Sequence, residues 1–291
     1  MKPLLLIVAL CGAILPAYAQ QDSSTYYYNS EWRDTSAVHA AYYRKAFRTD
    51  DHWGVRDYYM NGTLQMTGAY ADAAMKVRDG AFVYYDESGV RESYGSFTRG
   101  MRSGEWMDVY ETGAVRSRAV YKAGNIEGWW NNWYANGKLR ARGKYRHNKA
   151  VGRWKWYYEN GVVASSEKYR SGKLRKATFY NEDGSKTPGK PQIEVMAEYK
   201  GGETALYRYL QNNIRYPQDA IEQDWEGTVR VRFIVDTDGS VIKPVIRRGA
   251  YPALDAEALR VVRSMPAWTP ARSHNLPVRV YFLVPVTFRL Q

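Results

Sequence analysis

The 291-residue sequence contains one cysteine, Cys11, and only four histidines. Cys11 lies in an N-terminal apolar stretch, so removal of that stretch leaves no disulfide, thiol nucleophile or thiolate metal site. The histidines are scattered, and no two have the spacing of zinc ligands. A Gly-x-Ser-x-Gly elbow and a Walker-type phosphate loop are also absent. We therefore predict that the protein is not an enzyme and has no catalytic residues, metal site or cofactor.

The N-terminal apolar run, Leu4–Leu15, is shorter than the roughly 20 residues that a membrane-spanning helix needs. It follows the positively charged Lys2 and precedes the small residues Ala17 and Ala19, which frame a cleavage site. This pattern predicts a secretory signal peptide over residues 1–19. The alternative is that the segment is retained as an anchor.

Acidic residues are too few to balance the basic ones, and the net charge is +12. Ile193–Gln291 contains thirteen Lys and Arg against eleven Asp and Glu, so most of the excess lies before it. The excess favours either plain solubility or attraction to an anionic membrane surface or cell wall. Nucleic acid would match this charge equally well, but an exported protein rarely meets any, so we expect no nucleic-acid partner.

Glycines recur at a fixed spacing of 24 residues in the middle of the chain. One series is Gly80, Gly104, Gly128 and Gly152, and the other is Gly89, Gly113, Gly137 and Gly161. Two residues after the members of the first series stand Phe82, Trp106, Trp130 and Trp154. Three residues before members of the second stand Tyr110, Tyr134 and Tyr158, with Tyr59 before Gly62. A period of this length indicates stacked supersecondary units.

Each unit has the composition of a β-hairpin. Trp154–Tyr158 is rich in aromatic residues, which favour strands, and Glu159–Gly161 supplies a tight turn. A single hairpin cannot bury its apolar face, but a stack of hairpins can. At least five units fit into residues 53–186, after an irregular lead-in or cap over 20–52. The units resemble the MORN-variant repeats of bacterial antitoxin-like proteins.

The recurring aromatic residues have two interpretations. They form the core between stacked hairpins, or they offer a platform for carbohydrate or lipid. Trp129 and Trp133 break the alternation of their unit, so they are the candidates for exposure.

A linker rich in proline and glycine is predicted at residues 187–192, and we expect few contacts to cross it. Beyond it, residues 193–291 are predicted to form an α+β domain in which helices cover one face of a small antiparallel sheet. The predicted elements are helices over 203–214 and 217–223, strands over 229–235 and 241–247, a helix that begins at Pro252 and reaches Met265, and a last strand over 278–290.

Five motifs occur in the order typical of TonB C-terminal domains. They are Tyr216-Pro217, the Asp238-Gly239-x-Val241 turn, Leu254-Asp255, Pro266-x-Trp268-x-Pro270 and the valine-rich last strand. Residues 193–291 therefore resemble this family, although Ala271 and Asn275 stand where many relatives have glycines. The resemblance implies a protein of the Gram-negative periplasm that is connected with TonB-dependent transmembrane transport.

The resemblance also implies where a partner binds. In the TonB family, the last strand takes up the coupling peptide of an outer-membrane transporter, and the segment before the Tyr-Pro motif contacts the transporter. An edge strand can bind a peptide through its unpaired backbone groups, and Pro285 favours an edge position. The candidate partner-binding residues are Asn213, Ile214, Arg215, Tyr216, Pro217, Val278, Arg279, Val280, Tyr281, Phe282, Leu283 and Val284. Val280 and Phe282 would use their backbones while their side chains lie in the core.

The region upstream differs from a complete TonB transducer, which resembles a tether with a membrane-spanning helix and a long proline-rich spacer. Our first hypothesis is a periplasmic binding protein that engages outer-membrane transporters or other envelope proteins by strand addition. The second is a structural or inhibitory protein whose repeats bind envelope or membrane-surface ligands. The third is an energy transducer whose signal is retained as an anchor. The sequence favours the first hypothesis.

Overall fold

The computed structural model describes residues 23–290, and the chain divides into two compact units. The first unit ends at Gly137 and also includes Tyr145–Asn148. The second consists of Lys138–Lys144 and everything from Lys149 onward. The predicted signal peptide at residues 1–19 lies outside the described residues.

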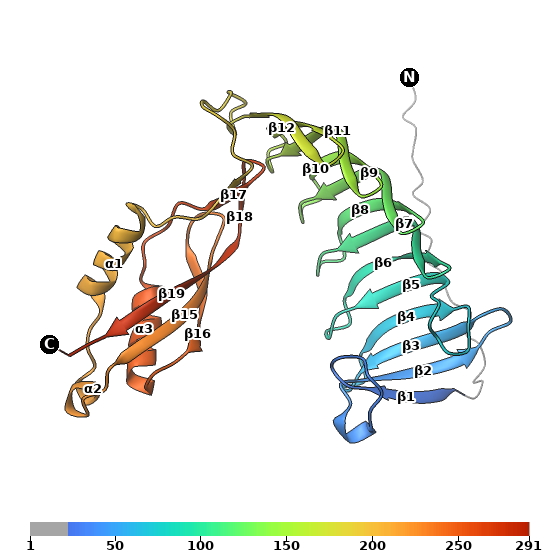
Figure 1. Cartoon of the computed structure of the whole chain (residues 1–291), viewed down its shortest axis with the longest axis horizontal. Helices are drawn as coiled ribbons and strands as arrows, with labels where there is room; N and C mark the ends of the chain where they lie inside the picture. The colour runs from blue at the N-terminus through green and yellow to red at the C-terminus, as the bar shows by residue number, and fades with distance from the viewer. Residues whose placement is uncertain (1–22, 291) are drawn as a thin grey trace. The chain divides into compact units, whose positions relative to one another are not determined.

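Strands β1 to β13 follow one another in chain order in a 13-stranded sheet (Figure 1). Neighbouring strands pair antiparallel from β1 to β9 and from β11 to β13. The bounds are β1 Ser24–Tyr28, β2 Tyr42–Arg48, β3 Trp53–Tyr59, β4 Leu64–Tyr70, β5 Gly80–Tyr85, β6 Arg91–Thr98, β7 Met101–Val109, β8 Val115–Lys122, β9 Asn125–Trp133, β10 Leu139–Arg146, β11 Lys149–Tyr157, β12 Val163–Arg170 and β13 Lys173–Phe179. The prediction of an all-β array of stacked hairpins is confirmed.

The turns between paired strands explain the second glycine series. Gly113 has a φ of 81°, which residues with a side chain rarely adopt, and its N–H donates to the Tyr110 carbonyl at 2.8 Å. Gly161 has a φ of 89° and makes the same bond to Tyr158 at 2.9 Å. The glycine period therefore marks where each hairpin reverses.

Three of the four aromatic residues of the first series are buried in the core of the array, and the fourth, Trp130, is half-buried. Phe82, Trp106 and Trp154 are buried, and each ring lies over a glycine of the preceding strand. These glycines are Gly68, Gly95 and Gly143, and a Cβ atom on any of them would overlap the ring. Of the two residues predicted to be exposed, Trp129 is exposed and Trp133 is half-buried.

The recurring tyrosines connect successive repeats through their hydroxyl groups. Tyr59 Oη donates to the Tyr85 carbonyl at 3.0 Å, and Tyr110 Oη donates to the Trp133 carbonyl at 2.7 Å. Tyr158 Oη donates to the Tyr180 carbonyl at 2.9 Å. In all three cases the acceptor immediately precedes the next turn of the array. We call Tyr59, Tyr110 and Tyr158 the inter-repeat tyrosines.

Residues 20–52, which we expected to be irregular or a cap, contribute β1, the 3-10 helix η1 (Ala37–His39) and β2. The Arg44 guanidinium on β2 forms a buried bidentate ion pair with Asp57 on β3, at 2.6 and 2.7 Å. The same guanidinium lies 5.4 Å from the ring centroids of Tyr28 and Tyr70. Arg44 and Asp57 lie opposite each other in the pairing of β2 with β3, and a shift of this register would leave one charge buried without its partner, which is costly.

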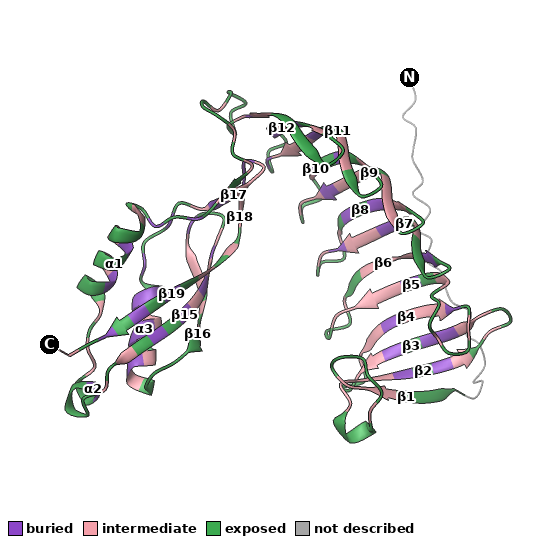
Figure 2. Cartoon of the chain, in the orientation of Figure 1, coloured by how far each residue is buried: buried purple, intermediate pink, exposed green. Residues whose placement is uncertain are grey.

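The C-terminal domain has the predicted α+β fold. Its sheet has the order β16-β15-β19, with β15 at Gly227–Val235, β16 at Val241–Arg248 and β19 at Val280–Phe288. The helices are α1 (Gly202–Asn213), α2 (Gln218–Glu222) and α3 (Pro252–Arg263). Helix α3 packs on β15 and β16, and the residues buried in this layer are drawn in purple in Figure 2. Pro252 occupies the first turn of α3, where its missing N–H costs no hydrogen bond.

This domain also contains a second, three-stranded sheet that was not predicted from the sequence. It consists of β14 (Glu194–Val195), β17 (Ala271–Ser273) and β18 (Leu276–Val278). His274 and Asn275 form the turn between β17 and β18, with φ values of 54° and 68°. Asparagine tolerates this region better than most residues other than glycine, which explains how Asn275 replaces a glycine there.

The turn between β17 and β18 contacts the last repeats, within the second unit. Asn275 Nδ2 lies 2.8 Å from the Tyr180 carbonyl and 3.2 Å from the Ala164 carbonyl. The His274 ring stacks on Trp156 with 3.8 Å between centroids. The expectation that few contacts cross the linker is therefore wrong, because a hairpin distant in sequence supplies them.

Candidate partner-binding site

Strand β19 lies at the edge of its sheet, as the sequence analysis predicted. It pairs antiparallel with β15 from Val280 opposite Val235 to Phe288 opposite Gly227, without a register shift. Among residues 23–290, no other strand joins β19 on the side away from β15. We call that side of β19 the free edge (Figure 1).

The burial pattern of β19 separates two sets of side chains. Val284, Val286 and Phe288 are buried in the core, whereas Tyr281 and Leu283 are 68% and 49% exposed. Side chains alternate between the two faces of a strand, so the odd-numbered residues lie on the face away from α3.

Pro285 determines which backbone groups face the free edge. Proline has no N–H, and within a sheet it lies where its nitrogen faces away from the neighbouring strand. Successive residues of a strand direct their N–H and C=O groups to opposite sides, so Tyr281 and Leu283 share the orientation of Pro285. We infer that the N–H groups of Tyr281 and Leu283 point away from β15 and are the donors available to a partner.

Charged groups surround the start of β19. The Arg232 guanidinium lies 4.9 Å from the Tyr281 ring centroid, a cation–π contact on the exposed face. Arg279 binds Asp236 through two hydrogen bonds of 2.8 and 2.9 Å, and this guanidinium lowers the pKa of Asp236. Arg279 is therefore engaged in an ion pair beside the strand, not in the strand itself.

The segment Asn213–Pro217 is held by polar contacts to α3 and the core. The Asn213 carbonyl accepts from Arg260 Nη2 at 2.6 Å, and the Arg215 N–H donates to Glu257 Oε1 at 2.6 Å. Tyr216 Oη donates to the Trp225 carbonyl at 2.5 Å, and its ring packs edge-on against Phe288. The segment is thus positioned before any partner arrives.

The structure does not bring the two groups of candidate residues into contact, because Tyr216 packs against Phe288, four residues beyond the last strand candidate, Val284. Tyr216 lies beside Phe288, whereas Val280 is eight residues away, or roughly 27 Å along an extended strand. Val278 lies in β18, where it pairs with Ala271, so it does not contribute to the free edge. A partner that contacts both groups would have to follow β19 over most of its length.

The second unit contains a buried carboxylate, Glu167, that was not predicted from the sequence. Glu167 on β12 accepts hydrogen bonds from Ser165 Oγ at 2.5 Å and Tyr169 Oη at 2.8 Å, and His274 Nδ1 lies 2.9 Å from its Oε1. Burial raises the pKa of Glu167, but the bonds from His274, Ser165 and Tyr169 outweigh it and leave this pKa below its usual value. No local signal could reveal the cluster, because His274 is 107 residues further along the chain.

Two features are absent from residues 23–290. No helix there is long and apolar enough to cross a membrane. No group of three or more His, Cys, Asp and Glu side chains in that range is placed to hold a metal ion.

Comparison with known proteins agrees with this architecture. Residues 212–290 match the model of the family described as Gram-negative bacterial TonB protein C-terminal. Residues 150–170 match the MORN repeat variant. The chain therefore carries a TonB-type C-terminal domain behind an array that contains a MORN-variant repeat, and the TonB family belongs to the Gram-negative cell envelope. No curated protein matches the chain.

Three solved structures are similar to parts of the chain. Two solution structures of the Helicobacter pylori TonB C-terminal domain are 24% and 23% identical, with TM-scores of 0.25 and 0.24. Each match covers 30% of this chain, and 79% and 90% of those chains. A complex of accessory secretory proteins 1, 2 and 3 from Streptococcus pneumoniae is 11% identical, with a TM-score of 0.21, and the match covers 48% of this chain and 22% of that one.

Proposed function

We propose that this protein is a periplasmic binding protein, not an enzyme, that engages TonB-dependent outer-membrane transporters or other envelope proteins by strand addition. The observation that carries the proposal is the free edge of β19. From the position of Pro285 on this strand we infer that the N–H groups of Tyr281 and Leu283 are directed away from β15. An extended peptide can pair with such an edge through main-chain hydrogen bonds.

The side chains beside the free edge supply the specificity. A peptide added to β19 alternates its own side chains between the two faces of the sheet. On the exposed face they would lie beside Tyr281, Leu283 and the guanidinium of Arg232. This surface favours a peptide that combines apolar residues with an acidic one.

The proposal is tested by placing proline at two parities of β19 in the full chain. In Leu283→Pro the lost N–H faces outward, so the pairing with β15 remains while one bond to the partner disappears. In Phe282→Pro the lost N–H faces β15, so the sheet itself is destabilised. The probe is a synthetic peptide from the coupling segment of a transporter of the same cell.

We expect Leu283→Pro to weaken peptide binding about fivefold or more at a nearly unchanged melting temperature. Leu283→Ala is the matched control, because it removes the side chain and keeps the N–H, and its affinity should fall less. Normal binding by a folded Leu283→Pro variant would remove β19 as the binding edge and leave Asn213–Pro217 as the next candidate.

A further inference from the structure

The inter-repeat tyrosine is missing at one position inside the array. Three residues before the turn glycines stand Tyr59, Asp86, Tyr110, Tyr134, Tyr158 and Asn181. The repeats before and after Asp86 both have a tyrosine at this position, whereas Asp86 is a short acidic side chain.

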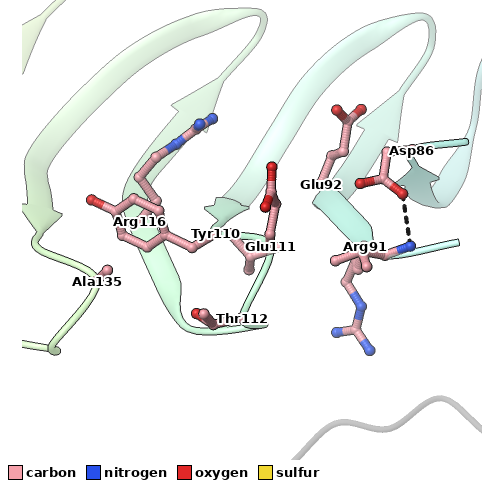
Figure 3. A pocket seen from close by; sticks show the side chains of 10 residues that line it. Asp86, Arg91, Glu92, Tyr110, Glu111, Thr112, Arg116 and Ala135 are labelled. Carbon is pink, nitrogen blue, oxygen red and sulfur yellow. Dashed lines mark hydrogen bonds between the residues drawn. The ribbon is translucent and has the colours of Figure 1, made fainter. Parts of the chain in front are cut away.

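A pocket of about 370 Å³ lies at the place where the missing ring would stand (Figure 3). Figure 3 shows Asp86 and Glu92 on one side of this pocket and Tyr110 and Glu111 on the other. The lining also includes Val109, the residue immediately before the next turn. Because Tyr85, Trp133 and Tyr180 provide the acceptor carbonyl at this position elsewhere, the corresponding acceptor here is the Val109 carbonyl.

Asp86 does not fill the space, because its own turn holds its side chain. Its Oδ1 accepts hydrogen bonds from Ser88 N–H at 2.9 Å, Ser88 Oγ at 2.6 Å and Val90 N–H at 2.9 Å. The carboxylate therefore stays with the β5–β6 turn and leaves open the gap that tyrosine spans in the neighbouring repeats.

Charged side chains of both signs line the pocket. Arg91 and Arg116 contribute guanidinium groups, and Glu92 and Glu111 contribute carboxylates. Such groups can bind both the N–H and C=O groups of a polypeptide, so they suit a ring that arrives on a peptide.

We propose that this pocket, the Asp86 slot, binds the tyrosine side chain of a partner protein. The phenol ring takes the place of the missing inter-repeat tyrosine, and its hydroxyl donates to the Val109 carbonyl. The slot belongs to the first unit and is independent of the free edge of β19, so each proposal can fail without the other.

The test uses the full chain and the probe N-acetyl-L-tyrosinamide, with N-acetyl-L-phenylalaninamide as the matched probe that lacks the hydroxyl. Backbone-amide chemical shifts give both the affinity and the place of binding. We expect saturable shifts at Val109–Thr112 and an affinity about fivefold higher for the tyrosine probe, because the phenyl ring leaves the carbonyl without a donor.

Substitution of Asp86 provides the second arm. Asp86→Tyr completes the array, so it should raise the melting temperature and abolish binding of the probe. Asp86→Asn keeps the turn and the open slot, so it should bind as the unchanged chain does. If Asp86→Tyr does not fold, the comparison of the two probes on the unchanged chain still tests whether the slot binds a tyrosine side chain.

Three results would overturn the proposal. The first is equal affinity for the two probes, and the second is a set of shifts that lies away from Val109–Thr112. The third is binding of N-acetylglucosamine in the slot without binding of the tyrosine probe, which would indicate a carbohydrate site instead.

Discussion

Glu167 makes the stability of the second unit depend on pH, together with other carboxylates whose pKa is lowered there, such as Asp236 and Glu257. Its pKa is lowered in the folded chain, so the unfolded chain takes up this proton at higher pH. The stability that Glu167 contributes is therefore present above the ordinary value of 4.5 and is lost as the pH falls through the lower folded value. We expect the melting temperature to fall on acidification below about pH 4.5.

Glu167→Gln should flatten this pH dependence and lower the stability at neutral pH by roughly 1–3 kcal/mol, because a charged acceptor for Ser165, Tyr169 and His274 is lost. Thermal melts between about pH 3 and pH 7 measure both effects. Glu182→Gln is the control, because Glu182 is exposed. An unchanged pH profile in Glu167→Gln would show that the buried cluster does not control the stability.

Single positions also show what the sequence could and could not reveal. The period identified the turn glycines and the buried aromatic residues, because both recur in phase with the hairpin. The inter-repeat tyrosines were visible as a series, but their role was not, because each acceptor is a backbone carbonyl 22 to 26 residues away. Because every residue has a backbone carbonyl, the sequence does not show which residue accepts the hydrogen bond.

Adjacent strands of the array pack through an aromatic ring on one strand that lies against a glycine of the other. We expect Gly95→Ala to destabilise the array by about 1–3 kcal/mol, because the added Cβ overlaps the Trp106 ring in a close-packed core. Chemical denaturation measures the change. Ser96→Ala, on the neighbouring half-buried residue, should change the stability much less. Equal effects of the two substitutions would contradict this account of the packing.

The elements of the C-terminal domain were predicted better than its connections. Alternation and helical spacing predicted α1, α2, α3, β15 and β16 to within a few residues. The last strand was predicted over 278–290, but the structure divides this stretch at Arg279. Strand β18 ends at Val278 and β19 begins at Val280. The alternation of apolar residues continues through Arg279, so it gives no sign of the division. Val278 belongs to a different strand because it pairs with Ala271.

A function in the periplasm requires that the whole protein be exported. Ala17 and Ala19 frame the expected cleavage site, so the N-terminal sequence of the native protein should begin at Gln20. Mass spectrometry of the N-terminal peptide of protein from a periplasmic fraction measures this directly, including when Gln20 has cyclised to pyroglutamate. A native protein that keeps residues 1–19 and fractionates with the inner membrane would favour the membrane-anchored energy transducer.

In the proposed function, a partner peptide adds to the free edge of β19. Backbone-amide hydrogen exchange of the full chain, with and without the transporter peptide, tests it most directly. We expect the Tyr281 and Leu283 amides to exchange quickly in the free chain and at least about tenfold more slowly with peptide bound. The Phe282 and Val284 amides, which face β15, should be protected in both states. If the peptide binds and the exchange rates of the Tyr281 and Leu283 amides stay the same, strand addition at β19 is contradicted.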